Sequence, residues 1–595
     1  MITFEHNKDL TSLTTFAIPA RARLYAEYAD VKDLIRITRS DEYNSNNVFH
    51  IGGGSNLLFD GEYDGLILKS KIKGRQIYRK DDKTVYVIAG ASENWSDFVD
   101  WCVENGLGGL ENLAGIPGEV GASAVQNVGA YGVEAGDRIF SVECFDSFTR
   151  KVVTLKPNEC RFGYRTSVFK TEAKGRYYVL RVSYLLTPSD ESSEYGYGPL
   201  KSFAEKLGRV PTIGEIADEV KRIRDSKLPN PAEIGSAGSF FKNPVINEYY
   251  FNEEVLRRNP DVPSYKAGEN LVKVPAGWLI EQAGFKGKVV GGAQVYPKQC
   301  LVLVNKDNAS AQDVLNLSNE IIKTVNEKFG IMLEPEVNII STKMKITILG
   351  SGTSKGVPEI ACGCRVCRSH DMHDKRLRAS ALVEVDGQNL LIDVTPDFRQ
   401  QALRCDLHHL DGVLITHSHY DHVGGFDDLR PFCFNGPVTV YLRHDVNEDL
   451  HRRLDYCFKS HLYPGVPVFD MKEISRSPFY INGTRILPIE VKHGKLPIVG
   501  YRIGDFAYLT DVKTISDEEK SKLFGLKGLV INALRRREHF AHFSLSEALA
   551  LIDEVKPERA WLTHFSHEMG LHSEVESMLP ENVYPCYDGL EIEIK

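Results

Sequence analysis

The stretch GIPGEVGASAVQNVGAYG, residues 115–132, spaces five glycines among mostly small side chains. Glycines this close together let the backbone approach a bulky ligand, because no Cβ stands in the way. Turns alone do not explain so long a run of small residues. We therefore expect this stretch to lie against a large ligand.

A glycine triplet occurs upstream in VFHIGGGSNLLF, residues 48–59, directly after a strand pattern. Its exposed backbone N–H groups can wrap a pyrophosphate. A Rossmann turn would continue into a helix, whereas LLFDGEYDGLILK (57–69) reads as further strand and turn. The first part of the chain is therefore predicted to be an α+β, non-Rossmann dinucleotide-binding fold. For the triplet alone, a simple glycine turn is the alternative.

Further motifs follow in order along the first 340 residues. They are CRFGYRTSVFK (160–170), SKLPNP (226–231), GSAGSFFKNP (235–244), VPAGWLIEQAGFKG (274–287) and LEPEV (333–337). In this order the motifs resemble the UDP-N-acetylenolpyruvoylglucosamine reductases. The resemblance implies a vanillyl-alcohol-oxidase-like FAD-binding domain at 1–200, a substrate-binding domain at 201–340, and reduction of the enolpyruvyl sugar by NADPH through FAD.

The same resemblance implies the binding residues. The expected FAD contacts are Gly52, Gly53, Gly54, Ser55, Asn56, Gly115, Ile116, Pro117, Gly118, Gly121, Ala122, Gln126, Asn127 and Gly129. The expected substrate contacts are Tyr164, Tyr197, Lys227 and Asn243, with Tyr195 as the alternative to Tyr197 in a loop that closes over the substrate.

Three residues are expected to carry the reduction. Hydride added to the vinyl carbon of an enolpyruvyl ether leaves negative charge on the adjacent carbon and carboxylate, so the site needs a fixed cation. Arg165 is the candidate, because a guanidinium stays charged and can bind a carboxylate through two N–H groups. By resemblance, Ser239 donates the proton and Glu336 stabilises the intermediate, with Glu334 as the alternative. Their presence argues against the competing class, a binding module without catalysis.

A second composition begins near Met344, which is interpreted as a former initiator. Seven of the eleven cysteines and sixteen of the eighteen histidines follow it. From there strand patterns alternate with helical patterns such as SLSEALALIDEV, which is typical of a layered α/β domain. We place this domain at 344–595.

The segment LITHSHYDHVGG (414–425) provides four metal-ligand side chains directly after an apolar strand: His417, His419, Asp421 and His422. Alternate residues point to different sides, so one pair can serve one ion and the other pair a second. This H.H.DH pattern resembles the metallo-β-lactamase superfamily, which implies an αββα sandwich with later ligands that His493, Asp511 and His564 match.

The resulting assignment has two catalytic ions, zinc or manganese, that activate a water for hydrolysis. His417, His419 and His493 are assigned to the first ion, Asp421, His422 and His564 to the second, and Asp511 to both. Asp393 is expected to orient a ligand histidine. His542 is a candidate general acid; for it and His539 an ordinary surface histidine is the alternative.

Three cysteines in ACGCRVCRSH (361–370), Cys362, Cys364 and Cys367, need one more ligand for a closed zinc site, and His567 is the best donor. The combination resembles the cyclic-phosphate phosphodiesterase branch of the superfamily. A phosphodiesterase is therefore favoured over a tRNA-processing nuclease, a thiolester hydrolase or a non-catalytic partner domain.

Composition restricts the class of protein. The 595 residues exceed the roughly 250 to 300 at which one hydrophobic core stops growing, so several domains are expected. Hydrophobic and charged contents of 42% and 26% are those of a globular protein. A net charge of -9 disfavours nucleic acid as a partner. No signal segment or membrane span is expected, and the cytoplasm is the predicted location.

Overall fold

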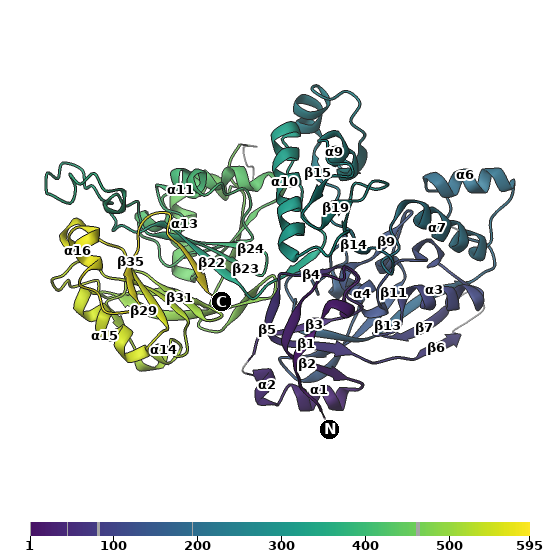
Figure 1. Cartoon of the computed structure of the whole chain (residues 1–595), viewed down its shortest axis with the longest axis horizontal. Coiled ribbons are helices and arrows are strands. Elements are labelled where there is room, and N and C mark those ends of the chain that lie inside the picture. The colour runs from purple at the N-terminus through teal and green to yellow at the C-terminus, as the bar shows by residue number, and fades with distance from the viewer. Residues whose placement is uncertain (1, 45, 80–83, 193, 460–464, 595) are drawn as a thin grey trace. The chain divides into compact units, whose positions relative to one another are not determined.

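The computed structural model describes residues 2–44, 46–79, 84–192, 194–459 and 465–594. It divides into two compact units, Met1–Thr342 and Lys343–Lys595 (Figure 1). Within the described ranges, no helix is both long enough and apolar enough to span a lipid bilayer.

Unit 1 opens with a four-stranded mixed sheet in the order β1-β2-β5-β3. Its strands are β1 (Glu5–Asp9), β2 (Arg21–Tyr28), β3 (Val48–Ile51) and β5 (Glu62–Ser70). Helix α1 (Val31–Ile37) is N-capped by Asp30, and its Leu34 and Ile37 pack against leucines of β2 and β5. The glycine triplet follows β3, as the strand-then-turn pattern predicted.

A larger antiparallel sheet forms the centre of unit 1, in the order β12-β11-β13-β7-β6, with β8 paired to β13. Its strands are β6 (Arg75–Arg79), β7 (Val85–Gly90), β8 (Leu107–Gly108), β11 (Ile139–Asp146), β12 (Lys151–Leu155) and β13 (Tyr177–Pro188). Helices α3 (Trp95–Glu104), α4 (Val120–Gln126) and α7 (Ile213–Lys227) share one apolar core with it. A capping box between Thr212 and Glu215 begins α7.

The remainder of unit 1 is a smaller layer with its own core. One sheet has the order β14-β20-β19-β18, from β14 (Gly235–Ser239), β18 (Val289–Val290), β19 (Ala293–Val295) and β20 (Val302–Asn305). Helices α9 (Ala276–Gln282) and α10 (Ala311–Phe329) pack on it (Figure 1). A second, three-stranded sheet joins β15 (Val245–Asn247), β16 (Tyr265–Gly268) and β17 (Leu271–Lys273).

The end of unit 1 returns to its beginning. Strand β21 (Asn338–Ile340) pairs in parallel with β4 (Leu57–Phe59), the strand after the glycine triplet. The Asn56 side-chain amide also donates to the Glu336 carbonyl at 3.1 Å. Glu336 is thereby held beside the glycine turn, although the two segments are 280 residues apart in the sequence.

Unit 2 contains two large sheets. One has the order β27-β26-β25-β24-β23-β22-β36, from β22 (Met344–Gly350), β23 (Ser380–Val385), β24 (Gln388–Ile392), β25 (Gly412–Leu414), β26 (Val438–Leu442), β27 (Phe469–Glu473) and β36 (Glu591–Ile594). The other has the order β28-β29-β30-β31-β33-β34-β35, from β28 (Phe479–Ile481), β29 (Thr484–His493), β30 (Leu496–Ile503), β31 (Phe506–Leu509), β33 (Gly528–Asn532), β34 (Arg559–Thr563) and β35 (Val583–Pro585).

The two sheets of unit 2 pack face to face, because one buried cluster joins Ile346 and Val383 of the first to Tyr501 and Tyr508 of the second. Helices α11 (Phe398–Arg404) and α13 (His444–Arg453) cover the outer face of the first sheet. Helices α15 (Leu545–Val555) and α16 (His572–Glu576) cover that of the second (Figure 1). The αββα sandwich expected from the sequence is confirmed.

Candidate functional sites

The two glycine segments of unit 1 face each other. A Cβ on Gly53 would lie 3.2 Å from the Gly118 Cα, and one on Gly118 would lie 2.9 Å from the Ser55 Oγ. Gly54 has φ +65° and its backbone passes so close to Leu13 that a Cβ would clash with the carbonyl oxygen. Only glycine permits the backbone segments to approach each other this closely. The arrangement is a backbone-lined cradle of the kind a dinucleotide phosphate requires.

Other expected cofactor residues lie around this cradle. The Ala122 Cβ approaches Gly52, and Gly121 lies against Ala91. Asn127 is buried, and its side chain accepts from the Gly136 N–H and donates to Glu134 and to the Gly163 carbonyl. Because these protein contacts engage both ends of its amide, Asn127 shapes the turn after α4.

Arg165 and Glu336 meet beside the cradle. The Arg165 Nε lies 3.0 Å from the Glu336 Oε1, and the Arg165 Nη2 donates to the Gly129 carbonyl at 2.6 Å. The Gln126 Nε2 donates to the same Oε1 at 3.1 Å. Two guanidinium nitrogens are thus held by the protein, and no described residue accepts a hydrogen bond from Nη1, which can therefore bind a carboxylate. Arg165 has φ 56°, a costly conformation for a non-glycine residue.

Ser239 is the last residue of β14, and the segment that follows it runs beside the Glu336 segment. Backbone bonds link the Glu336 N–H to the Phe240 carbonyl at 2.7 Å and the Lys242 N–H to the Glu334 carbonyl at 2.9 Å. The segment that carries Glu336 therefore runs alongside the end of β14. Glu334, the alternative, is exposed and forms an ion pair with Lys242 at 3.1 Å.

The expected substrate residues come from four separate segments of unit 1. The Lys273 Nζ lies 4.1 Å from the centre of the Tyr164 ring. Asn243 accepts from the Ala276 N–H at 2.9 Å, at the start of α9. Tyr197 precedes α6 (Gly198–Leu207), is exposed, and lies edge-on to Tyr131 in the glycine-rich stretch. Lys227 is the exposed last residue of α7.

In unit 2 the expected metal ligands form one cluster at the strand ends. Three groups have ligand atoms within 4.8 Å of one another: His417, His422, Asp511; Asp421, His422, His564; and His493, Asp511, His542. The His419 ring lies 4.6 Å from that of His417 and 5.1 Å from that of His493. His419 is exposed whereas His417, His422, Asp511 and His564 are buried, so the cluster opens to solvent on the His419 side.

Hydrogen bonds orient the ligand histidines. The His493 Nδ1–H donates to the Ala541 carbonyl at 2.9 Å, and the His422 Nδ1–H to the Asp393 Oδ2 at 2.7 Å. The Thr416 hydroxyl donates to the same Asp393 oxygen at 2.8 Å, so toward His417 it can only accept, from Nδ1–H at 3.0 Å. In each of the three rings the proton lies on Nδ1, and the Nε2 lone pair is free to bind a metal.

The chemistry of this donor set fits metal ions. The buried His417 Nε2, His422 Nε2 and both His564 ring nitrogens have no hydrogen-bond partner among the described residues. The His422 Nε2 nevertheless lies 3.2 Å from carboxylate oxygens of both Asp421 and Asp511. Such atoms are costly to bury unless a cation lies between them. The Asp511 oxygens lie 3.2 Å from ring nitrogens of His422 and His564. They also lie within 4.8 Å of ligand nitrogens of His417 and His493, so Asp511 is within reach of both ligand sets.

Burial and the nearby carboxylates shift the pKa values of the cluster histidines in opposite directions. Burial, with neighbouring His422, lowers the pKa of His417 well below its usual range, and burial lowers that of His542 to about 3. His422 differs: burial opposes the shift, but Asp421, Asp393 and Asp511 surround the ring and raise its pKa. Metal ligands are neutral imidazoles and ionised carboxylates, so His422 would release its second proton when an ion binds.

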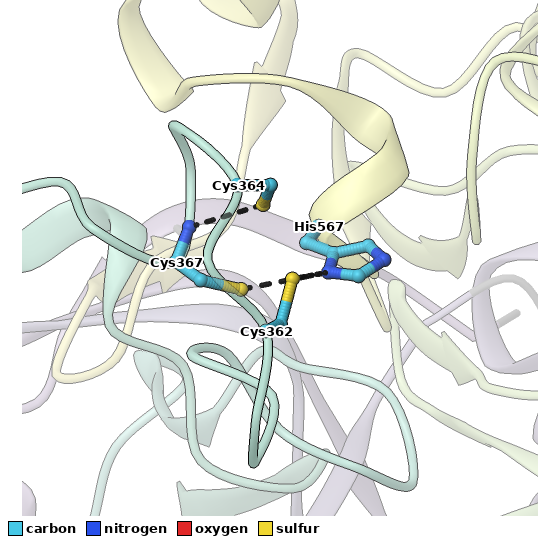
Figure 2. A group of neighbouring side chains, drawn as sticks. All are labelled: Cys362, Cys364, Cys367 and His567. Carbon is cyan, nitrogen blue, oxygen red and sulfur yellow. Dashed lines mark hydrogen bonds between the residues drawn. The ribbon is translucent and has the colours of Figure 1, made fainter.

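The cysteine group is a second, separate site (Figure 2). All four ligand atoms of Cys362, Cys364, Cys367 and His567 lie within 4.8 Å of one another. The His567 Nδ1 is 3.2 Å from the Cys362 sulfur and 3.5 Å from the Cys367 sulfur. Ligands at about 2.3 and 2.0 Å in a tetrahedral zinc site are separated by about 3.5 Å. The group therefore fits one zinc ion.

Comparisons with known proteins cover both units. Family models match an FAD binding domain at 22–155, a UDP-N-acetylenolpyruvoylglucosamine reductase C-terminal domain at 230–340, and a beta-lactamase superfamily domain at 388–565. The UDP-N-acetylenolpyruvoylglucosamine reductase of Flavobacterium johnsoniae is 43% identical over 337 residues, which are 56% of this chain and 99% of that protein. The one from Neisseria meningitidis serogroup A is 46% identical over 56% of this chain and 96% of its own.

Among solved structures, a diphosphatase from the PhnP family is 37% identical and covers 42% of this chain and 98% of its own, with a TM-score of 0.40. The fold and sites thus define a flavin-dependent reductase joined to a metallo-β-lactamase-fold hydrolase, an enzyme with two activities. The chain belongs to the UDP-N-acetylenolpyruvoylglucosamine reductase family and carries the hydrolase as an additional unit.

Thr416 and Lys69 are among the residues near these sites that escaped the sequence analysis. Thr416 orients His417, and only its position directly before the H.H.DH pattern marks it. The Lys69 ammonium contacts the Gly52 carbonyl and lies 3.4 Å from Glu119, beside the glycine cradle. A lysine at the end of a strand gives no signal in the sequence, because its neighbours come from distant segments.

Proposed function

We propose that unit 1 reduces UDP-N-acetylglucosamine enolpyruvate to UDP-N-acetylmuramate, a peptidoglycan precursor, with NADPH as the reductant. The observation that carries the proposal is the Arg165–Glu336 pair beside the glycine cradle, with Ser239 on the adjoining strand end. The relatives from Flavobacterium johnsoniae and Neisseria meningitidis, which this chain matches over 99% and 96% of their length, are UDP-N-acetylenolpyruvoylglucosamine reductases.

Bound FAD would accept hydride from NADPH and pass it to the vinyl carbon of the substrate. Arg165 binds the substrate carboxylate through its Nη1 donors while Glu336 fixes the guanidinium from the Nε side. The Ser239 hydroxyl then gives its proton to the carbon next to the carboxylate. Tyr164, Tyr197, Lys227 and Asn243 hold the UDP-sugar.

The test for unit 1 is whether NADPH oxidation by the purified chain depends on the substrate. We expect FAD-containing protein to oxidise NADPH rapidly only when the enolpyruvyl sugar is present, and to form UDP-N-acetylmuramate in equal amount. A slow oxidation that the sugar does not stimulate would contradict the proposal.

We propose that unit 2 is a phosphodiesterase acting on a small phosphodiester. Its support is the combination of an open two-metal donor set with a separate Cys₃His group. His417, His419 and His493 would hold one ion and Asp421, His422 and His564 the other, and together the ions would supply an activated water and charge stabilisation for an in-line displacement. Zinc or manganese suits the imidazole and carboxylate donors, and zinc suits the cysteine group.

The protein side of this reaction follows from the donor set. Asp393 and Thr416 fix the histidine tautomers, so the ligand lone pairs converge without reorganisation. His542 lies 3.4 Å from Asp511, and burial lowers its pKa to about 3, which favours the neutral ring. We propose that it donates a hydrogen bond to the leaving oxygen.

A substrate screen on the full chain tests unit 2. We expect cyclic phosphates or small phosphodiesters to be hydrolysed at least about tenfold faster than thiolesters or pre-tRNA, with the activity lost in Asp511→Asn. Preferred cleavage of pre-tRNA or of thiolesters would overturn the assignment.

A further inference from the structure

Lys170 lies beside the reductase site and has no part in the chemistry described above. Its ammonium donates to the Gln126 Oε1 at 2.6 Å and to the Arg165 carbonyl at 3.2 Å. The other end of the Gln126 amide, Nε2, donates to the Glu336 Oε1 at 3.1 Å. A continuous series of hydrogen bonds therefore links Lys170 to the carboxylate that contacts Arg165.

Lys170 determines the orientation of the Gln126 side-chain amide. A glutamine amide has an acceptor end and a donor end, whereas a protonated lysine has three donors and no acceptor. Only Oε1 of Gln126 can therefore face Lys170, and Nε2 is turned toward Glu336. The carboxylate receives a second donor on the same oxygen that Arg165 contacts.

We propose that Lys170 is a positioning residue of the reductase, which acts through Gln126 to hold the Glu336 carboxylate in place against Arg165. The inference rests on the proposed roles of Arg165 and Glu336. Without the lysine, the amide can rotate and present its oxygen to the carboxylate. Two acceptors would then repel, and the guanidinium would lose its fixed partner.

The charge of Lys170 adds a pH dependence. Burial and the nearby Lys242 lower the pKa of Lys170 to about 8; Glu336 opposes this shift, and Lys174 and Arg165 add to it. Above that pH the neutral amine has a lone pair and can accept from Nε2, so the amide orientation is no longer enforced. The lysine function is therefore present below about pH 8 and lost above it.

The test measures flavin reoxidation by the enolpyruvyl sugar as a function of pH in full-length, FAD-loaded protein. For the natural chain we expect the rate to fall above about pH 8. Lys170→Arg retains a donor-only cation that does not titrate in this range. The rate of this variant should therefore not fall above about pH 8. Lys170→Met should be slower by about tenfold or more at low pH, as expected when a hydrogen bond to a charged group is lost. It should also lack the inflection.

Lys242→Met is the matched control, because it removes a nearby positive charge that pairs with Glu334 and has no bond to Gln126. It should keep the fall in rate, moved to somewhat higher pH because Lys242 no longer lowers the pKa of Lys170. A double-mutant cycle gives the second readout: Lys170→Met combined with Gln126→Leu should be no slower than Gln126→Leu alone, compared at equal FAD content. The affinity for the enolpyruvyl sugar is measured by the flavin absorbance change in the oxidised protein. It should likewise be no lower in the double variant than in Gln126→Leu alone.

Three outcomes would overturn the inference: a Lys170→Arg profile with the fall unchanged, additive losses in the cycle, or a Lys170→Met protein with a normal rate. If Lys170→Met loses FAD, the Lys170→Arg profile alone decides. Arg165→Met separates this inference from the proposed function. Normal reoxidation in Arg165→Met would refute the proposed reductase chemistry, whereas slow reoxidation with a normal Lys170→Met protein would refute only the role of Lys170.

Discussion

Four residues of the proposed sites have a strained backbone, although other residues of the chain share this conformation. Arg165, Asp393, Asp511 and His564 all have positive φ angles, between 56° and 63°. Each such non-glycine residue costs on the order of 1–3 kcal/mol and persists only when the surroundings impose it. In both units, residues with this conformation include some whose side chains belong to the proposed sites. This supports a function for them that packing alone does not require.

At Ser239 the two half-reactions can be separated. Ser239→Ala should leave flavin reduction by NADPH nearly unchanged and slow reoxidation by the enolpyruvyl sugar by about 10²- to 10⁴-fold, because only the second step needs a proton donor. Stopped-flow absorbance of the flavin measures each step. An equal loss in both would indicate a damaged cofactor site instead.

Thr416 offers a test of histidine orientation. Thr416→Val keeps the shape but removes the acceptor for the His417 Nδ1–H, so we expect metal affinity to fall by roughly 10- to 100-fold. Asp393→Ala should lower it further, because this carboxylate also holds His422 directly. Metal titration of the apo-protein measures both. Equal affinities in Thr416→Val and the natural chain would remove the orienting role.

At the scale of elements, the loop before β23 depends on the cysteine group. Cys362 and Cys364 are only half-buried, and a surface cavity of about 290 Å³ reaches Cys364 and His567. Burial therefore does not protect a bound zinc. Retention would depend on four ligands held by the loop and by the segment after β34 (Figure 2).

The two kinds of metal site should differ toward chelators. Mild chelation should abolish hydrolysis while about one zinc per chain remains, because the thiolate-rich group has four protein ligands and the other cluster keeps an open side. Cys364→Ser should release this zinc. A loss of 2 kcal/mol would lower the melting temperature of unit 2 by roughly 4–8 °C.

Full zinc content and unchanged melting in Cys364→Ser would show the cysteines to be bystanders. The flavin reductase rate serves as the internal control, since every residue proposed for it lies before Met344.

Sequence patterns predicted the elements better than their pairings. The glycine turns, the H.H.DH segment and the cysteine spacing are local, so neighbouring residues suffice to recognise them. The parallel pairing of β4 with β21 and the place of β36 beside β22 depend on segments far apart in the chain. For the same reason Lys170 and Thr416 were missed: their roles exist only through the partners that the fold brings to them.

At the scale of the whole molecule, the two units should be separable. Strand β21 ends at Ile340 within unit 1, and β22 begins at Met344 within unit 2. A cut between Thr342 and Lys343 spares both sheets. We expect a yellow reductase and a colourless metalloenzyme, each retaining its activity within about twofold. Loss of reductase activity in the first piece, at full FAD content, would show that unit 2 supports it.

The central claim is that one chain carries two independent active sites, and two point variants of the full chain test it most directly. Both activities are measured on Arg165→Met and on Asp511→Asn. The account predicts that Arg165→Met loses about 10²-fold or more of its reductase activity and keeps its hydrolase, with the reverse for Asp511→Asn. A variant that lost both activities while properly folded, or neither, would contradict it.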